Sequence, residues 1–131
     1  KEAGWLEQLT ESREKASRLF RQLEELEVFF DLEFKSQELE RINSLLASPE
    51  TWNDQKRFQS LQQKKKQLEK DLQFYQSLAD KKEEIEVLLE LAEEGEKVLD
   101  DLNRAIRNFE QELQAAELRT LFFDPDDARN A

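Results

Sequence analysis

Hydrophobic residues recur at three- and four-residue steps along most of the chain, which is the pattern of an apolar stripe on an α-helix. One such stretch covers about residues 4–47, with a gap in the stripe at residues 12–13 and a possible break near residues 30–31. Two more stretches follow, over about residues 55–93 and 96–122. No alternating apolar and polar run is long enough for a strand. The pattern therefore predicts an all-α fold.

Two sequence features separate these helices. Pro49 cannot continue the preceding helix and favours an extended backbone at Ser48. Asn53 and Asp54 are both suited to cap the helix that follows, and Gly95 is suited to close that helix in a left-handed conformation. The short connection after Gly95 predicts that the last two helices are antiparallel neighbours. We expect a single domain, an elongated antiparallel helical bundle or coiled-coil hairpin of three main helices.

Large aromatic residues lie near the predicted helix ends. Trp52 falls in the segment after Pro49, where the favoured interpretation is that it plugs the end of the bundle and the other is that it contacts a partner. Core packing is the favoured interpretation for five phenylalanines. In the other interpretation, the last two of them pack against a following domain. The five are Phe29, Phe30, Phe34, Phe122 and Phe123.

Composition narrows the chemistry. The chain has no Cys and no His, which excludes disulfides, thiol nucleophiles, zinc fingers and histidine acid–base catalysis. Its two glycines, at positions 4 and 95, cannot form a phosphate-binding loop. Carboxylates are abundant, but nothing in these polar helix faces predicts the shifted pKa that general acid–base work needs. We therefore expect no enzymatic activity from this chain, and no catalytic, cofactor-binding or metal-ligating residue.

Charge is the second constraint. With 31 acidic and 20 basic residues the formal net charge is −11, which argues against direct nucleic-acid reading by the domain as a whole. Two charged clusters each have two interpretations. The favoured one is a solvated surface, and the other is a contact surface for a partner. An acidic end of the hairpin would dock on a basic partner, and a short lysine run would touch RNA phosphates. The acidic cluster is Glu83, Glu84, Glu86, Glu90, Glu93, Glu94 and Glu96, and the lysine run is Lys64, Lys65 and Lys66.

Nothing in the sequence predicts a membrane association. The longest apolar run is three residues, at 87–89, whereas about 20 are needed to cross a bilayer. The chain begins at Lys1 and contains no Met, so we expect it to be part of a longer multidomain protein.

Four motifs, in their order and spacing, resemble the N-terminal helical domain of the bacterial-type peptide chain release factor 2 family. The resemblance covers about residues 19–131, and the Trp-Asn-Asp segment is its most specific part. The motifs lie at residues 30–33 (Phe-Asp-Leu-Glu), 48–54 (Ser-Pro-Glu-Thr-Trp-Asn-Asp), 88–92 (Leu-Leu-Glu-Leu-Ala) and 117–121 (Glu-Leu-Arg-Thr-Leu).

The resemblance implies a ribosome-docking domain in translation termination. Full-length factors of this family read UAA and UGA stop codons through a Ser-Pro-Phe tripeptide and promote peptidyl-tRNA hydrolysis through a Gly-Gly-Gln loop. Neither motif occurs here, because Ser48 and Pro49 are followed by Glu50 and no two glycines are adjacent. The family implies contact with the stalk-base region of the large ribosomal subunit, dealings with the release factor 3 GTPase, and a cytoplasmic location in a bacterium, with an organelle as the alternative.

A second interpretation comes from a different class. The same helices would suit a structural coiled-coil or spectrin-like spacer, or a general protein-interaction module. A spacer of this kind is expected to repeat at a fixed period, and the chain shows no internal repeat.

Overall fold

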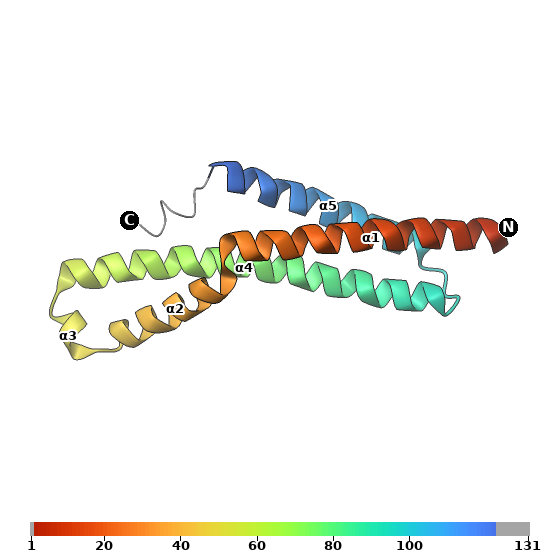
Figure 1. The fold of residues 1–131 in the computed structure, drawn as a ribbon. Helices are drawn as coiled ribbons and strands as arrows, with labels where there is room; N and C mark the ends of the chain where they lie inside the picture. The colour runs from red at the N-terminus through yellow and green to blue at the C-terminus, as the bar shows by residue number, and fades with distance from the viewer. Residues whose placement is uncertain (1, 123–131) are drawn as a thin grey trace. The chain divides into compact units, whose positions relative to one another are not determined.

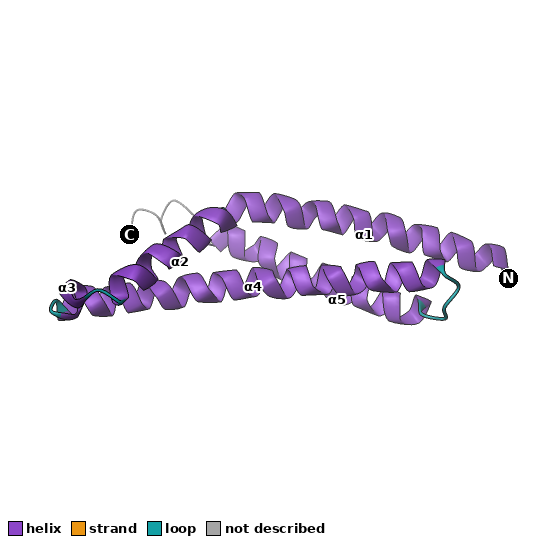
Figure 2. Cartoon of the chain, turned by 90° about the horizontal axis from the view of Figure 1, so that it is seen from below, coloured by secondary structure: helices purple, strands orange, loops and turns teal. Residues whose placement is uncertain are grey.

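The computed structural model describes residues 2–122, and over this range the chain is helical without any strand. The all-α prediction is therefore confirmed (Figure 2). None of the helices in the described range is both long and apolar enough to cross a membrane. Within that range the helices are α1 (Glu2–Phe30), α2 (Leu32–Leu46), α3 (Pro49–Trp52), α4 (Gln55–Glu93) and α5 (Leu99–Phe122), as labelled in Figure 1.

The chain divides into two compact units that share helix α4. The first, called here the three-helix unit, comprises Lys1–Phe30 and Ser77–Ala131, and so contains α1, the second part of α4 and α5. The second, called the hairpin unit, is Asp31–Gln76, with α2, α3 and the first part of α4.

The three-helix unit is packed as a coiled coil. Buried residues on α1 and on α5 follow each other at alternating steps of three and four, the spacing of a heptad seam. Phe109 is fully buried at the centre of the α5 series, and its ring meets that of Phe20 edge-on at a centroid distance of 5.8 Å. The series are Leu9, Ser12, Ala16, Leu19, Leu23 and Leu26 on α1, and Leu102, Ile106, Phe109, Leu113 and Ala116 on α5.

Cross-helix ion pairs join the helices of this unit. Lys81 on α4 and Glu112 on α5 form an ion pair at 3.1 Å, and Figure 1 shows the second part of α4 and α5 running in opposite directions, as the prediction of an antiparallel hairpin requires. On α1, Lys15 pairs with Glu110 of α5 at 3.1 Å. Figure 1 shows α1 and α5 running alongside each other in the same direction.

Two polar residues occupy positions that the heptad spacing reserves for apolar ones. Ser12 sits in the gap of the α1 stripe, is only 7% exposed, and donates its hydroxyl to Oδ1 of Asn103 on α5 at 2.6 Å. Lys82 on α4 occupies the register between buried Leu78 and Ile85, and its ammonium lies 5.3 Å from the centre of the Phe20 ring. Polar side chains are tolerated inside the seam because each one has a partner there.

The hairpin unit has a thinner core. Its buried apolar residues within the described range are Ile42 on α2, and Leu61 and Tyr75 on α4. An ion pair joins the same two helices, Lys35 to Asp71 at 3.2 Å, with side chains only 15% and 18% exposed. Most of the apolar burial of the chain therefore belongs to the three-helix unit.

Asp31 separates α1 from α2. Its backbone is in the left-handed region at φ 50°, and its carboxylate accepts the backbone N–H of Phe34 at 3.2 Å. A short acidic side chain tolerates this conformation and satisfies one of the free N–H groups of the new helix.

Gly95 ends α4 with a left-handed residue at φ 93°. The N–H of Gly95 donates to the carbonyl of Ala92, and the N–H of Glu96 donates to that of Leu91, which together form a Schellman closure. Because the closure extends to Glu96, α5 begins at Leu99, three residues later than the spacing of apolar residues suggested.

Gly95→Ala is expected to destabilise the chain by about 1–2 kcal/mol, the cost of a left-handed backbone for a residue with a Cβ. Nothing lies within 4 Å of the added methyl group, so backbone strain is its only effect. Gly4→Ala is the matched control, because Gly4 is helical, exposed and equally open, and there the change is expected to stabilise. Thermal unfolding followed by circular dichroism measures both, and equal shifts of the same sign would contradict the assignment.

Candidate interaction surfaces

The glutamates predicted to form an acidic end lie on the last turns of α4 and in the turn before α5. All seven are exposed, while Ile85 and Ala92 of the same segment are buried. The side chain of Glu93 accepts a hydrogen bond from Arg13 of α1, so it takes part in holding the three-helix unit together. The other six are exposed to solvent. The seven are Glu83, Glu84, Glu86, Glu90, Glu93, Glu94 and Glu96.

The structure separates the three lysines of the run, because successive residues of a helix point about 100° apart. Lys65 is half-buried in the register between Leu61 and Leu68, the stripe that faces α2. Lys64 lies close enough to Glu38 of α2 for its charge to act on that carboxylate. Lys66 is exposed, on the side of α4 opposite Leu68. The run is therefore not a single basic patch.

Glu38 illustrates the local electrostatics. The hydrogen bonds from Arg41 are the main cause that holds the pKa of the Glu38 carboxyl below its ordinary value. Burial opposes them, and the positive charges of Arg41 and Lys64 add to the lowering. The same pairing raises the pKa of the Arg41 guanidinium. Because the pair lies near the surface, its contribution to stability is small.

The segment after α2 forms the short helix α3. Ser48 is its N-cap in an extended conformation and Pro49 is its first residue, while Asn53 is its C-cap. Asp54 lies before α4 and accepts the backbone N–H of Arg57 at 3.1 Å, as the N-cap of that helix does.

Trp52 does not plug the end of the hairpin, and the favoured interpretation of a buried ring was wrong. Its side chain is 60% exposed, and Thr51 fills the interior position instead. Neighbouring residues of a helix face different directions, so α3 can bury only one of the two. The indole Nε1–H donates to the carbonyl oxygen of Leu46 at 2.6 Å, at the end of α2 where carbonyls lack helical partners. Trp52 therefore serves as a side-chain cap for α2.

Trp52→Phe is expected to cost about 0.5–1 kcal/mol, because the ring remains and only one hydrogen bond to a water-accessible carbonyl is lost. Trp52→Ala is expected to remain well below the 3–5 kcal/mol typical of a buried aromatic ring. Urea unfolding measures both variants. A loss of 3 kcal/mol or more for the alanine variant would show that the indole is buried.

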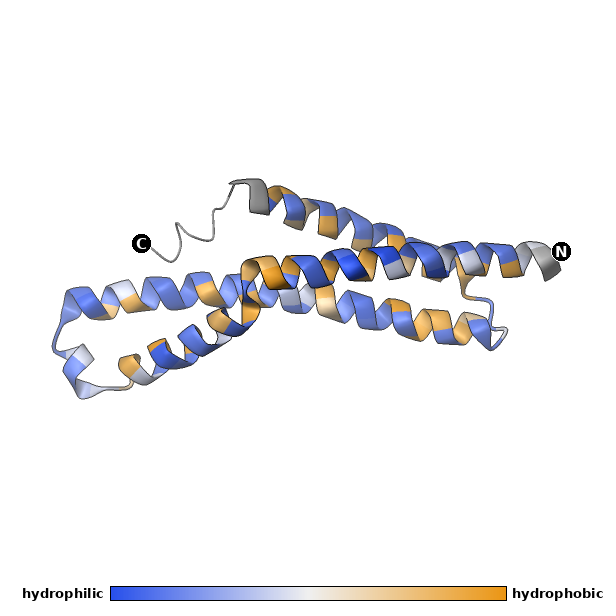
Figure 3. Cartoon of the chain, in the orientation of Figure 1, coloured by the Kyte–Doolittle hydropathy of each residue, from blue (hydrophilic) through white to orange (hydrophobic). Residues whose placement is uncertain are grey.

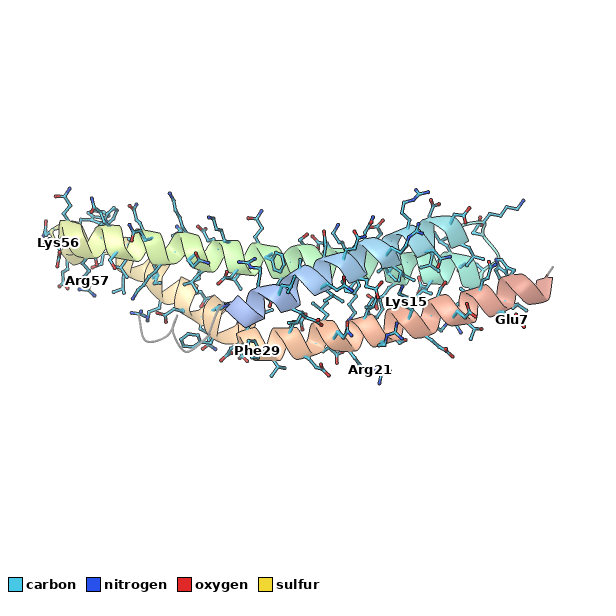
Figure 4. The ribbon with its side chains drawn as sticks, turned by 90° about the horizontal axis from the view of Figure 1, so that it is seen from above. Glu7, Lys15, Arg21, Phe29, Lys56 and Arg57 are labelled. Carbon is cyan, nitrogen blue, oxygen red and sulfur yellow. The ribbon has the colours of Figure 1, made fainter. Side chains whose placement is uncertain are left out.

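Core packing was also the wrong interpretation for two of the phenylalanines. Phe29, at the end of α1, and Phe34, at the start of α2, are both exposed. Figure 4 shows Phe29 on the outer side of α1, and its ring contacts that of Phe30 at a centroid distance of 5.4 Å. The side chain of Phe122 and the whole of Phe123 lie outside the described residues.

The described part of the chain contains no candidate metal centre. Among those residues no group of three or more Asp, Glu, Cys or His side chains converges as it would on a metal ion. What the described surface offers is charge and hydrogen-bonding groups on rigid helices, which suits binding to a large partner.

Comparison with known proteins adds a family. The model of the PCRF domain matches residues 35–131. Curated relatives named peptide chain release factor 2 include those of Janthinobacterium sp. (strain Marseille), 36% identical over 110 residues, and of Kosmotoga olearia, 31% identical over 108 residues. These alignments cover 81% and 82% of this chain and 29% of each relative. The relative from Shewanella baltica is 33% identical over 77% of this chain and 28% of its own length. The chain thus spans less than a third of the relatives it matches.

Proposed function

The chain belongs to the PCRF domain family, and from this membership we propose that it is the ribosome-docking domain of a class I translation termination factor of the release factor 2 type. Two findings together support the proposal. The family match covers residues 35–131, and the relatives that extend over most of the chain are release factors of one type. A spacer or general interaction module has no comparable support.

The proposed activity belongs to the full-length factor. It reads UAA and UGA and promotes hydrolysis of peptidyl-tRNA, through codon-reading and Gly-Gly-Gln parts that are not in this sequence. The chain itself contributes no reacting group, and we expect the isolated domain to support no hydrolysis. Its location would be where ribosomes are, in the bacterial cytoplasm or in an organelle.

The proposed partners are the stalk-base region of the large subunit and the release factor 3 GTPase. The acidic cluster on the three-helix unit suits the basic surface of a ribosomal protein, where complementary charge accelerates encounter and fixes orientation. The distribution of formal charge between the two units supports an acidic docking surface on the three-helix unit. The hairpin unit contains eight acidic and eight basic residues, so the entire net charge of −11 belongs to the three-helix unit.

A domain exchange tests the proposal. The PCRF domain of the Janthinobacterium release factor 2 is replaced by this chain, and peptide release is measured at UAA, UGA and UAG codons, with and without release factor 3. We expect the hybrid to release at UAA and UGA and to respond to release factor 3 as its parent does. A matched hybrid carrying an unrelated helical bundle is the control. A hybrid no better than this control would contradict the proposal.

A further inference from the structure

The outward face of the first part of α4 carries a regular row of lysine and glutamine side chains. The inward stripe of this segment is formed by residues 58, 61, 65, 68, 72 and 75, of which Leu61 and Tyr75 are buried. Residues two positions earlier are rotated by about 200°, and so lie on the opposite side of the helix. All six are exposed. This Lys/Gln row is Lys56, Gln59, Gln63, Lys66, Lys70 and Gln73.

The row contains cations and amides but no carboxylate, in a protein where acids outnumber bases. It extends over 18 residues, and the 17 steps between the first and the last span about 25 Å at 1.5 Å each. Ion pairs join Lys35 to Asp71 and Arg41 to Glu38 in the hairpin unit, and neither pair uses a lysine of the row. Figure 4 shows Lys56 and Arg57 at the first turn of α4, and in Figure 3 this part of the helix is predominantly hydrophilic.

The same face changes sign in the second part of α4. There the inward series continues at residues 82, 85, 89 and 92. The residues two positions earlier are Asp80, Glu83, Val87 and Glu90. From residue 55 to 76 the helix has six basic and two acidic residues, and from 77 to 93 it has two basic and six acidic residues. On this face of α4 the positive charges are therefore separated from the negative ones along the helix. The positive charges of the face lie in the hairpin unit.

We propose that the Lys/Gln row binds the sugar–phosphate backbone of RNA. This inference rests on the proposed function, which makes the ribosome the partner, and it assigns the RNA contact to one face of α4. Lysines neutralise phosphates, and glutamine amides can donate to phosphate oxygens and exchange hydrogen bonds with ribose hydroxyls across the wide minor groove of an RNA helix.

The composition of the row favours RNA over an acidic protein. Interfaces between proteins are centred on buried aromatic and aliphatic anchors and are depleted in lysine. The row contains no apolar residue over its whole length. Backbone recognition of nucleic acid requires no such anchor, because phosphate contacts provide the affinity and fix the orientation.

The test compares two triple variants with the same change in charge. Lys56→Gln, Lys66→Gln and Lys70→Gln together remove the cations of the row. Arg18→Gln, Arg21→Gln and Lys97→Gln remove three exposed cations of the three-helix unit. Circular dichroism verifies that both variants remain helical. Binding to a fluorescent RNA duplex of about two helical turns is then measured by anisotropy as a function of salt.

For the wild-type chain we expect the logarithm of the affinity to fall linearly with the logarithm of salt concentration. The row variant should bind at least about tenfold more weakly at low salt, with a slope reduced by about one for each lysine removed. The control variant should retain the wild-type slope. Equal affinities for both variants, or equal binding of a poly-glutamate peptide of the same charge as the RNA, would overturn the assignment to RNA.

Ribosome binding by the same variants separates this inference from the proposed function. If the chain binds ribosomes and the row variant binds them equally well, the inference is wrong and the proposed function stands. If the chain binds the RNA duplex through the row but does not bind ribosomes, the proposed function is wrong and the RNA-binding surface stands.

Discussion

Phe109→Ala is expected to lower the free energy of unfolding by about 3–5 kcal/mol, the range for large aromatic side chains removed from a core. The ring is 0% exposed at the centre of the α5 series and makes an edge contact with Phe20 of α1. Its removal would leave a cavity in the seam between two helices. Because domains are typically stable by about 5–15 kcal/mol, this loss would be a large share of the total.

Urea unfolding monitored by circular dichroism measures the effect, with Leu118→Ala as the matched control. Leu118 lies on the same helix but is exposed, so its truncation should change stability by no more than about 0.5 kcal/mol. If both variants unfolded at the same urea concentration, Phe109 would not be a core residue and the packing of the three-helix unit would need revision.

Ile42→Ala is expected to cost about 2–5 kcal/mol, with its effect concentrated in the hairpin unit. Ile42 is 0% exposed, and it is the single buried apolar residue of α2 within the described range. The few other buried apolar groups of this unit, Leu61 and Tyr75, cannot compensate for its loss. We therefore expect local unfolding of the hairpin unit before the three-helix unit opens.

Amide hydrogen exchange resolved along the chain measures this effect. Residues 31–76 should lose protection in the variant, while residues 2–30 and 77–122 retain theirs. Ser44→Ala, an exposed change on the same helix, is the control and should alter neither region. Loss of protection spread evenly over both regions would show that the chain unfolds as one cooperative unit.

The part of the fold that could be predicted from the sequence is the part that depends on helical periodicity. Leu19, Leu23 and Leu26 lie on the predicted stripe of α1 and are buried, because a sustained seam leaves only one face to pack. The same rule failed at Leu6, which falls in the apolar stretch 4–47 three residues before buried Leu9 but is exposed. Periodicity identifies the face of a helix that can be buried, whereas burial at one position also requires a neighbouring helix there.

The buried polar residue could not be assigned in this way. Ser12 was a gap in the stripe, and its partner Asn103 lies 91 residues away, so no local pattern links them. The position of Trp52 was also beyond local rules, because either Thr51 or Trp52 could have faced inward from a helix of four residues. Both cases depend on contacts between elements, which periodicity does not encode.

The candidate surfaces could also be predicted only in part. The sequence suggested a surface of three consecutive lysines, yet three consecutive residues on a helix are spread over about 200° and do not share one face. The signal that reveals the Lys/Gln row is the same three- and four-residue spacing that reveals the core, applied to polar residues two positions earlier. Lys56 was missed because it lies far from the lysine run in the sequence.

Competition for the ribosome is the direct test of the proposed docking function. The chain lacks cysteine, so a single substitution such as Glu24→Cys, at an exposed position of α1, gives a uniquely labelled fluorescent probe. Its binding to bacterial 70S ribosomes is measured by anisotropy, with unlabelled Janthinobacterium release factor 2 as competitor. A ribosome-docking domain of this type should bind saturably and be displaced completely by the release factor. Absence of binding, or binding that the release factor does not displace, would contradict the account.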